Sequence, residues 1–135
     1  MRLWHYKMID YLPTSQLVAQ WRELNSIFVK QDNHILINYV YQYPKQDLMI
    51  YTNIVLNQMQ TRGFKIHTKS YSNYLNYFSG VDIVNYYPPF KDHHNKDYLA
   101  ICYYNLYEKY LRNQKDFSDE RYNQLLMLYN KSILE

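Results

Sequence analysis

Apolar residues recur every three or four positions in four stretches of the chain, and nowhere does the sequence sustain the strict alternation of a half-buried strand. Spacings of three and four place such residues on one face of an α-helix. We therefore expect an all-α fold, a compact single-domain helical bundle of about four to five helices over residues 1–135. The expected helices cover residues 15–30, 44–63, a stretch that carries residues 99–110, and the chain from about residue 118, while a short helix over 71–78 is left open.

Capping residues predict where these helices begin and end. Thr14 and Ser15 are candidate N-caps of the first helix, because their side-chain oxygens can accept hydrogen bonds from free backbone N–H groups. Pro44 suits the first position of the second helix, and Gly63 suits a left-handed residue at its end. The third helix follows the Pro88-Pro89 break.

The length of 135 residues is typical of one domain, and 47% hydrophobic residues lie far from the composition of disordered chains. No apolar run approaches the roughly 20 residues of a membrane span. Arg2, His5, Lys7 and Asp10 interrupt any secretory segment, so we expect a cytoplasmic protein. The single cysteine, Cys102, excludes an internal disulfide and a multi-cysteine zinc site.

The distribution of charge favours a polyanionic partner for the first part of the chain. Residues 1–80 hold eight Lys and Arg against four acids, a net +4, whereas residues 81–135 hold seven against eight, a net −1. Neutralising phosphates with such a basic surface releases counterions. An ordinary mildly basic surface explains the same numbers. Two glycines in the whole chain are too few for the phosphate-binding loops of Rossmann or P-loop proteins.

Glu23 is the only glutamate in the first 107 residues. At 100° per residue it lies off the apolar stripe of the first helix and beside Gln16, Ala19, Ser26 and Lys30, a set read from a helical wheel. A lone carboxylate among bases can act as a general acid or base, or stabilise a developing cation. The alternative is a solvated acid paired with Arg22 or Lys30.

The remaining candidate groups have plain structural interpretations. His93 and His94 are adjacent, and no other His, Cys or Glu stands at a spacing that would complete a metal site with them. Cys102 lies on an apolar helix stripe, which is typical of a packed core thiol rather than a nucleophile. His5 and His34 belong to no motif by themselves. The Tyr71–Phe78 stretch could stack on unpaired bases, but core packing explains it equally well.

The opening segment MRLWHYKMIDYLP, followed by LVAQWREL at 17–24, resembles the pyrimidine-dimer DNA glycosylase family, the phage endonuclease V type and its bacterial relatives. The aromatic-Arg-Glu-Leu core stands at the same distance from the amino terminus as in the phage enzymes. Asn33-His34 and QMQTRGFKI at 58–66 are similar to later parts of the family pattern, and NLYEK at 105–109 resembles its last helix.

This resemblance implies a compact helical enzyme that needs neither metal nor cofactor. In the family, the N-terminal α-amine attacks deoxyribose C1′, the base leaves as an imine forms, and β-elimination then cleaves the strand. An α-amino group titrates at about 7.7–8.0, against about 10.4 for lysine, so part of it is an uncharged nucleophile at neutral pH. The phage enzymes expose a threonine after loss of the initiator methionine, whereas the bulky Arg2 predicts that Met1 is retained. The resemblance thus assigns catalysis to the Met1 amine and to Glu23.

The resemblance also implies a partner, damaged double-stranded DNA, whose nucleotide is extruded from the helix. Arg22 corresponds to a phosphate or lesion contact and Lys109 to a phosphate contact, and we expect them to border one basic concavity with Arg2. Gln16 replaces a family histidine, and Ser26 and Asn105 replace arginines. The residues we assign to DNA binding are Arg2, Gln16, Arg22, Lys30, His34 and Lys109.

We expect a monomer without membrane or metal partners. The alternative function is a non-catalytic DNA-binding or protein-interaction module that has kept the fold and lost the geometry of the amine.

Overall fold

Five α-helices and two short 3-10 helices make up the regular structure of the computed structural model, which describes residues 1–135 and contains no strand. In chain order they are η1 (Tyr6–Tyr11), α1 (Thr14–Lys30), η2 (Asn38–Gln42), α2 (Lys45–Thr61), α3 (Thr68–Tyr77), α4 (Lys96–Leu111) and α5 (Asp119–Ile133). The all-α prediction is confirmed, and the helix left open over 71–78 exists as α3. The periodicity does not predict η1 and η2, because short 3-10 turns carry no sustained 3.6-residue repeat.

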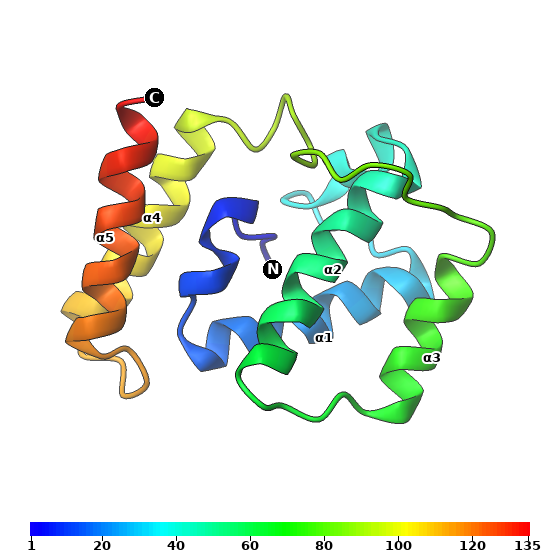
Figure 1. Ribbon diagram of the computed structural model, residues 1–135, viewed down its shortest axis with the longest axis horizontal. Helices are drawn as coiled ribbons and strands as arrows, with labels where there is room; N and C mark the ends of the chain where they lie inside the picture. The colour runs from blue at the N-terminus through cyan, green and yellow to red at the C-terminus, as the bar shows by residue number, and fades with distance from the viewer.

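The helices form two groups with the amino-terminal segment between them. Helices α4 and α5 pack against each other as an antiparallel pair, and α1 packs against both α2 and α3 (Figure 1). The short helix η1 contacts α2 on one side and α5 on the other, so it joins the two groups. A single cluster of 26 buried apolar residues runs from Leu3 to Leu125 through this arrangement. None of the helices combines the length and the apolar composition that crossing a membrane requires.

The start of α1 differs from the predicted capping. Pro13 occupies the N-cap position, and neither Thr14 nor Ser15 caps the helix with its side chain, because both already lie inside its first turn. The Ser15 backbone N–H instead donates to the Asp116 carboxylate at 2.7 Å, across 101 residues of sequence. An acid from the α4–α5 connection therefore satisfies the free N–H group that a local cap was expected to satisfy.

The other helix boundaries follow the sequence more closely. Pro44 is the N-cap of α2 rather than its first helical residue, so that helix begins one position later than predicted. Gly63 has a φ of +85°, the left-handed conformation expected after the end of α2. Ser118 caps α5 by accepting a hydrogen bond from the Arg121 backbone N–H.

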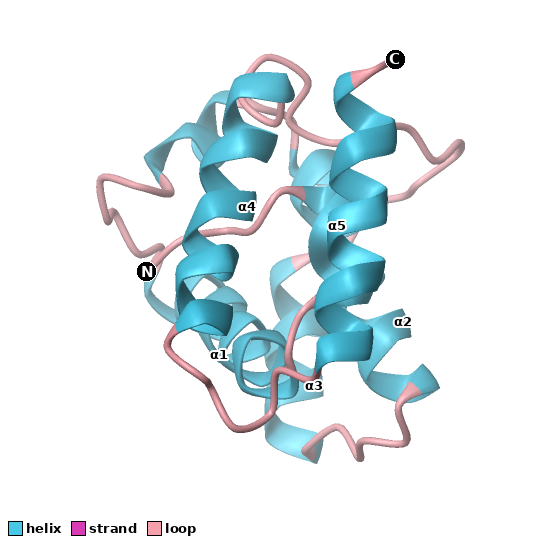
Figure 2. Ribbon diagram, turned by 90° about the vertical axis from the view of Figure 1, so that its left-hand side faces the viewer, coloured by secondary structure: helices cyan, strands magenta, loops and turns pink.

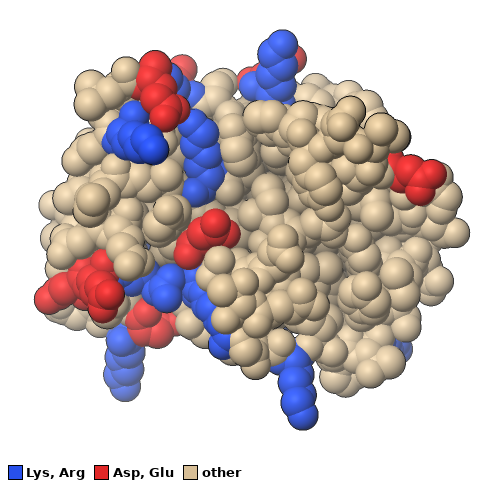
Figure 3. Space-filling model, viewed as in Figure 1, with Lys and Arg blue, Asp and Glu red and all other residues tan.

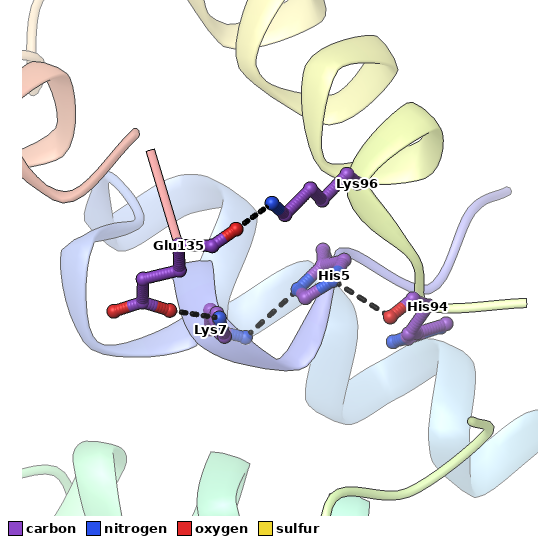
Figure 4. A network of polar contacts seen from close by, with 5 residues as sticks. All are labelled: His5, Lys7, His94, Lys96 and Glu135. Carbon is purple, nitrogen blue, oxygen red and sulfur yellow. Dashed lines mark hydrogen bonds and ion pairs between the residues drawn. The ribbon is translucent and has the colours of Figure 1, made fainter. Parts of the chain in front are cut away.

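Two buried histidines fasten the amino-terminal segment to the loop before α4. The His5 ring contacts the His94 carbonyl through Nε2 at 3.0 Å (Figure 4). The Tyr6 backbone N–H donates to His94 Nδ1 at 3.2 Å. At the edge of this network, Lys7 and Lys96 both contact Glu135. The segment that begins with Met1 is therefore held in place on the side facing α4.

Candidate active site

A surface cavity of about 290 Å³ lies where the amino-terminal segment, α1 and α4 meet. Figure 2 shows the amino terminus at the surface of the molecule, next to α4. Three other surface hollows, of about 380, 470 and 540 Å³, are larger, but neither Met1 nor Glu23 lines any of them. The residues around the smaller cavity are Met1, Arg2, Trp4, Gln16, Ala19, Glu23, Leu36, Asn105 and Lys109.

Two helices supply most of the polar lining because of their residue spacing. Gln16, Ala19 and Glu23 stand three and four positions apart on α1, so they share one helix face. Asn105 and Lys109 stand four apart on α4 and face them across the cavity. The helical-wheel grouping of Glu23 with Gln16 and Ala19 is thus confirmed.

Glu23 forms no ion pair, which excludes pairing with Arg22 or Lys30 in this structure. Its carboxylate is half-buried and accepts a hydrogen bond from Gln20 Nε2 at 3.0 Å. Burial raises the pKa of Glu23 above its usual value, since the charged form loses water. The positive charge of the Met1 amine and a backbone hydrogen bond from Arg2 act in the opposite direction on that pKa. The site therefore contains a partly desolvated carboxylate within the electrostatic reach of an α-amine.

The amine belongs to a segment that the protein holds closely. Leu3 is completely buried, and its carbonyl accepts a hydrogen bond from the Tyr98 hydroxyl of α4. The Trp4 carbonyl accepts another from the Tyr51 hydroxyl of α2 at 2.6 Å. Met1 therefore extends from an anchored backbone and lines the same cavity as Glu23.

Two of the predicted cationic residues, Arg2 and Lys109, line this cavity. The guanidinium carbon of Arg2 lies 5.8 Å from the centre of the Tyr98 ring, a cation–π distance that places the side chain along α4. On the face drawn in Figure 3, basic and acidic side chains are interspersed and form no continuous basic surface. That face therefore offers no continuous site for a polyanion.

The other three predicted DNA-binding side chains lie outside the cavity. Arg22, Lys30 and His34 are exposed and none belongs to its lining. The expectation that Arg22 borders one concavity with Arg2 and Lys109 is wrong. Arg22 is adjacent to Glu23 on α1, and adjacent residues on a helix point about 100° apart, so the Arg22 side chain does not share the helix face that lines the cavity. Arg22 and His34 are nevertheless close enough for their charges to lower the pKa of Glu23.

His93 and His94 have structural partners, and Cys102 lies in the core. The Tyr43 hydroxyl contacts His93 Nδ1, and the Tyr39 hydroxyl contacts His94 Nε2, each at 2.6 Å. Cys102 is buried in the core, and burial raises the pKa of its thiol. No group of three or more His, Cys, Asp or Glu side chains has an arrangement that could hold a metal ion.

Residues 71–78 are divided between core and surface. Tyr74 and Phe78 are buried and pack edge-to-face on Phe28, as the core-packing interpretation predicts. Tyr71 is 40% exposed and is free to meet other molecules.

Sequence reasoning missed three residues of the site: Trp4, Gln20 and Leu36. Gln20 is completely buried and donates a hydrogen bond to Glu23, although the sequence pattern predicts that a polar residue beside an apolar stripe lies on the surface. The available signal was its position three residues before Glu23, which places the two side chains on neighbouring parts of one helix face. Leu36 comes from a loop whose course periodicity cannot predict.

Comparison with known proteins adds one match. A family model described as pyrimidine dimer DNA glycosylase matches residues 1–72, slightly more than half of the chain. The matched region contains Met1 and Glu23 but not Asn105 or Lys109 on α4. No curated protein and no solved structure shows a significant match.

Proposed function

The chain belongs to the pyrimidine dimer DNA glycosylase family, and we propose on this basis that it excises damaged bases from double-stranded DNA and then cleaves the strand at the resulting abasic site. The observation that carries the proposal is that Met1 and Glu23 line one surface cavity and that the charge of the Met1 amine acts on the Glu23 carboxylate. The amine is the nucleophile and the carboxylate is the acid–base group. The amino-terminal location of both residues agrees with the region that the family model matches.

The first chemical stage is base release. The uncharged Met1 nitrogen forms a bond to deoxyribose C1′ while the glycosidic bond breaks, and the base leaves with the bonding electron pair and takes up a proton. The C1′–O4′ bond then breaks with its electron pair on O4′, the two protons of the nitrogen are transferred to the departing base and to O4′, and an imine remains between Met1 and C1′. Positive charge develops on the sugar in the transition state, and the ionised Glu23 carboxylate stabilises it electrostatically.

The second stage is strand cleavage. A proton leaves C2′, the electrons move to form the C2′–C3′ double bond, and the C3′–O bond breaks with its electron pair on the departing phosphate. The imine makes the C2′ proton more acidic, and Glu23 accepts it as a general base. Water then hydrolyses the imine and regenerates the free amine. All of these steps use groups of the chain and water.

DNA binding in this proposal depends on charge around the cavity mouth. Arg2 and Lys109 contact phosphates beside the extruded nucleotide, and Gln16 offers amide hydrogen bonds at the same place. Arg22, Lys30 and His34 are exposed outside the cavity and contact the flanking backbone. Each neutralised phosphate makes the affinity depend on salt.

The test is a comparison of three duplexes of the same sequence: undamaged, ultraviolet-irradiated, and carrying one abasic site. We expect cleavage of the irradiated and abasic duplexes but not of the undamaged one, and we expect Glu23→Gln to bind the irradiated duplex and release little base. Cleavage of the abasic duplex alone would restrict the activity to the second stage. Binding of irradiated DNA without cleavage of any duplex would favour the non-catalytic DNA-binding module instead.

A further inference from the structure

The Gln20 side chain uses all of its hydrogen-bonding capacity inside the protein. A primary amide offers two donors and two acceptor positions. Gln20 Oε1 accepts from the Trp4 backbone N–H and from the Tyr51 hydroxyl, both at 2.8 Å. Its Nε2 donates to the Arg2 carbonyl at 3.1 Å and to Glu23 Oε2 at 3.0 Å. No part of this amide is exposed to solvent.

These four hydrogen bonds connect the two groups to which we assign the chemistry. Two of them hold the backbone at Arg2 and Trp4, on the residues that follow Met1. A third holds the Glu23 carboxylate from within the same helix. Because a single rigid amide makes all of these contacts, a shift of the amino-terminal segment relative to Glu23 breaks at least one of them.

Tyr51 braces the arrangement from a second helix. Its single hydroxyl proton is shared between the Trp4 carbonyl at 2.6 Å and Gln20 Oε1 at 2.8 Å, so the ring on α2 contacts both α1 and the amino-terminal segment. The Tyr51 side chain is completely buried. Its place is therefore set by the core rather than by solvent-exposed contacts.

We propose that Gln20, braced by Tyr51, is a positioning residue. It holds the backbone that carries Met1 and the Glu23 carboxylate at the relative positions, or register, that the reaction requires. This inference rests on the proposed function, because register matters only if the two groups act on one sugar. An error of about 1 Å in such an arrangement can lower a rate by about 100-fold. Gln20 itself does not touch the substrate in this scheme, since it lies beneath the cavity lining.

If Gln20 only filled space in the core, its loss would leave the pKa of the Glu23 carboxylate unchanged. The Gln20 N–H donates to the Glu23 carboxylate, and such a donor favours the ionised form, so we expect its loss to move the pKa of Glu23 further upward. The other groups that lower this pKa are the Met1 amine, the Arg2 backbone N–H, Arg22 and His34, and each of them is still present in a Gln20→Met variant. Methionine has a similar length but cannot make the four hydrogen bonds.

The first experiment is an NMR titration of the glutamate carboxyls in the free protein. The chain has only four glutamates, and Glu23→Gln identifies the relevant signal. We expect the pKa of Glu23 to rise in Gln20→Met and to stay at the wild-type value in Tyr122→Phe. Tyr122 is a matched control, because its buried hydroxyl pairs with Tyr103 and neither residue lines the cavity. An unchanged Glu23 titration in Gln20→Met would overturn the proposal.

The second experiment measures borohydride trapping on abasic duplex under single-turnover conditions. We expect trapping to slow by about 100-fold in Gln20→Met and about 10-fold in Tyr51→Phe, with duplex affinity unchanged, while Tyr122→Phe traps like the wild type. Equal rates in Tyr51→Phe and Tyr122→Phe would count against the brace, and this comparison remains decisive if Gln20→Met does not fold. A wild-type protein that forms no adduct would refute the proposed function, whereas the carboxyl titration, which needs no DNA, would still decide whether Gln20 holds Glu23.

Discussion

Acid should destabilise this protein through the two histidines that anchor its amino-terminal segment. His5 Nδ1 accepts a hydrogen bond from the Lys7 backbone N–H, and His94 Nδ1 accepts one from the Tyr6 backbone N–H. These contacts assign the single proton of each neutral ring to Nε2, where His5 donates to the His94 carbonyl and His94 donates to the Tyr39 hydroxyl. A second proton on either ring would place an N–H group against an N–H group.

The size of the effect follows from the pKa values of the folded state. Burial lowers the pKa of His5 to about 4 and that of His94 to about 2, and both rings are almost inaccessible to solvent. In the unfolded chain a histidine titrates at about 6.5, so below that pH the unfolded state binds protons that the folded state does not. Stability is therefore present above about pH 6.5 and is lost as the pH falls, and His5 alone removes about 2 kcal/mol by pH 5.

Urea unfolding between pH 8 and pH 5 measures this loss, and His5→Gln isolates the contribution of one ring. The variant cannot take up a proton at this position, so its unfolding free energy should fall by about 2 kcal/mol less than that of the wild type over the same range. At pH 8 it should be the less stable of the two, because glutamine replaces a packed ring (Figure 4). Parallel pH dependences of wild type and His5→Gln would refute the assignment of a neutral, buried His5.

Four further substitutions test other parts of the structure. Glu23→Gln should lower single-turnover base release by about 10²–10⁴-fold while leaving affinity for damaged duplex, measured by fluorescence anisotropy, within about twofold. Arg22→Ala and Lys109→Ala should each weaken duplex binding and reduce the slope of log affinity against log salt by about 0.9, and an unchanged slope would remove that residue from the phosphate contacts. Asp116→Ala should cost about 1 kcal/mol in urea unfolding, because it leaves the Ser15 backbone N–H at the start of α1 without its acceptor.

Much of the fold could be predicted because helices encode their buried faces locally. Leu17, Trp21 and Leu24 are buried along α1, as their spacing of three and four requires. The capping of α1 could not be predicted in the same way, since Asp116 is distant in sequence and approaches only when α4 and α5 pack. Local capping rules predicted Thr14 or Ser15 as the cap of α1, whereas the tertiary contact with Asp116 supplies the acceptor.

The candidate site could likewise be predicted where it depends on one helix, and not where it depends on tertiary packing. The helical wheel grouped Glu23 with Gln16 and Ala19, because three residues of one helix share a face without any tertiary information. The position of Lys109 opposite them depends on how α4 packs, and only the family resemblance pointed to it. For Gln20 the sequence indicates only its closeness to Glu23 on α1, since its other partners lie in the amino-terminal segment and in α2.

The central claim is that the Met1 amine forms the bond to the sugar, and borohydride trapping followed by peptide mapping tests it most directly. The protein is incubated with abasic duplex and borohydride, digested, and analysed by mass spectrometry to locate the cross-linked residue. The account predicts one adduct, on the Met1 nitrogen, and its loss after acetylation of the amino terminus, which removes the nucleophile and leaves Glu23 and the cationic side chains in place. An adduct on Lys7, Lys30 or another lysine, or undiminished trapping by the acetylated protein, would contradict it.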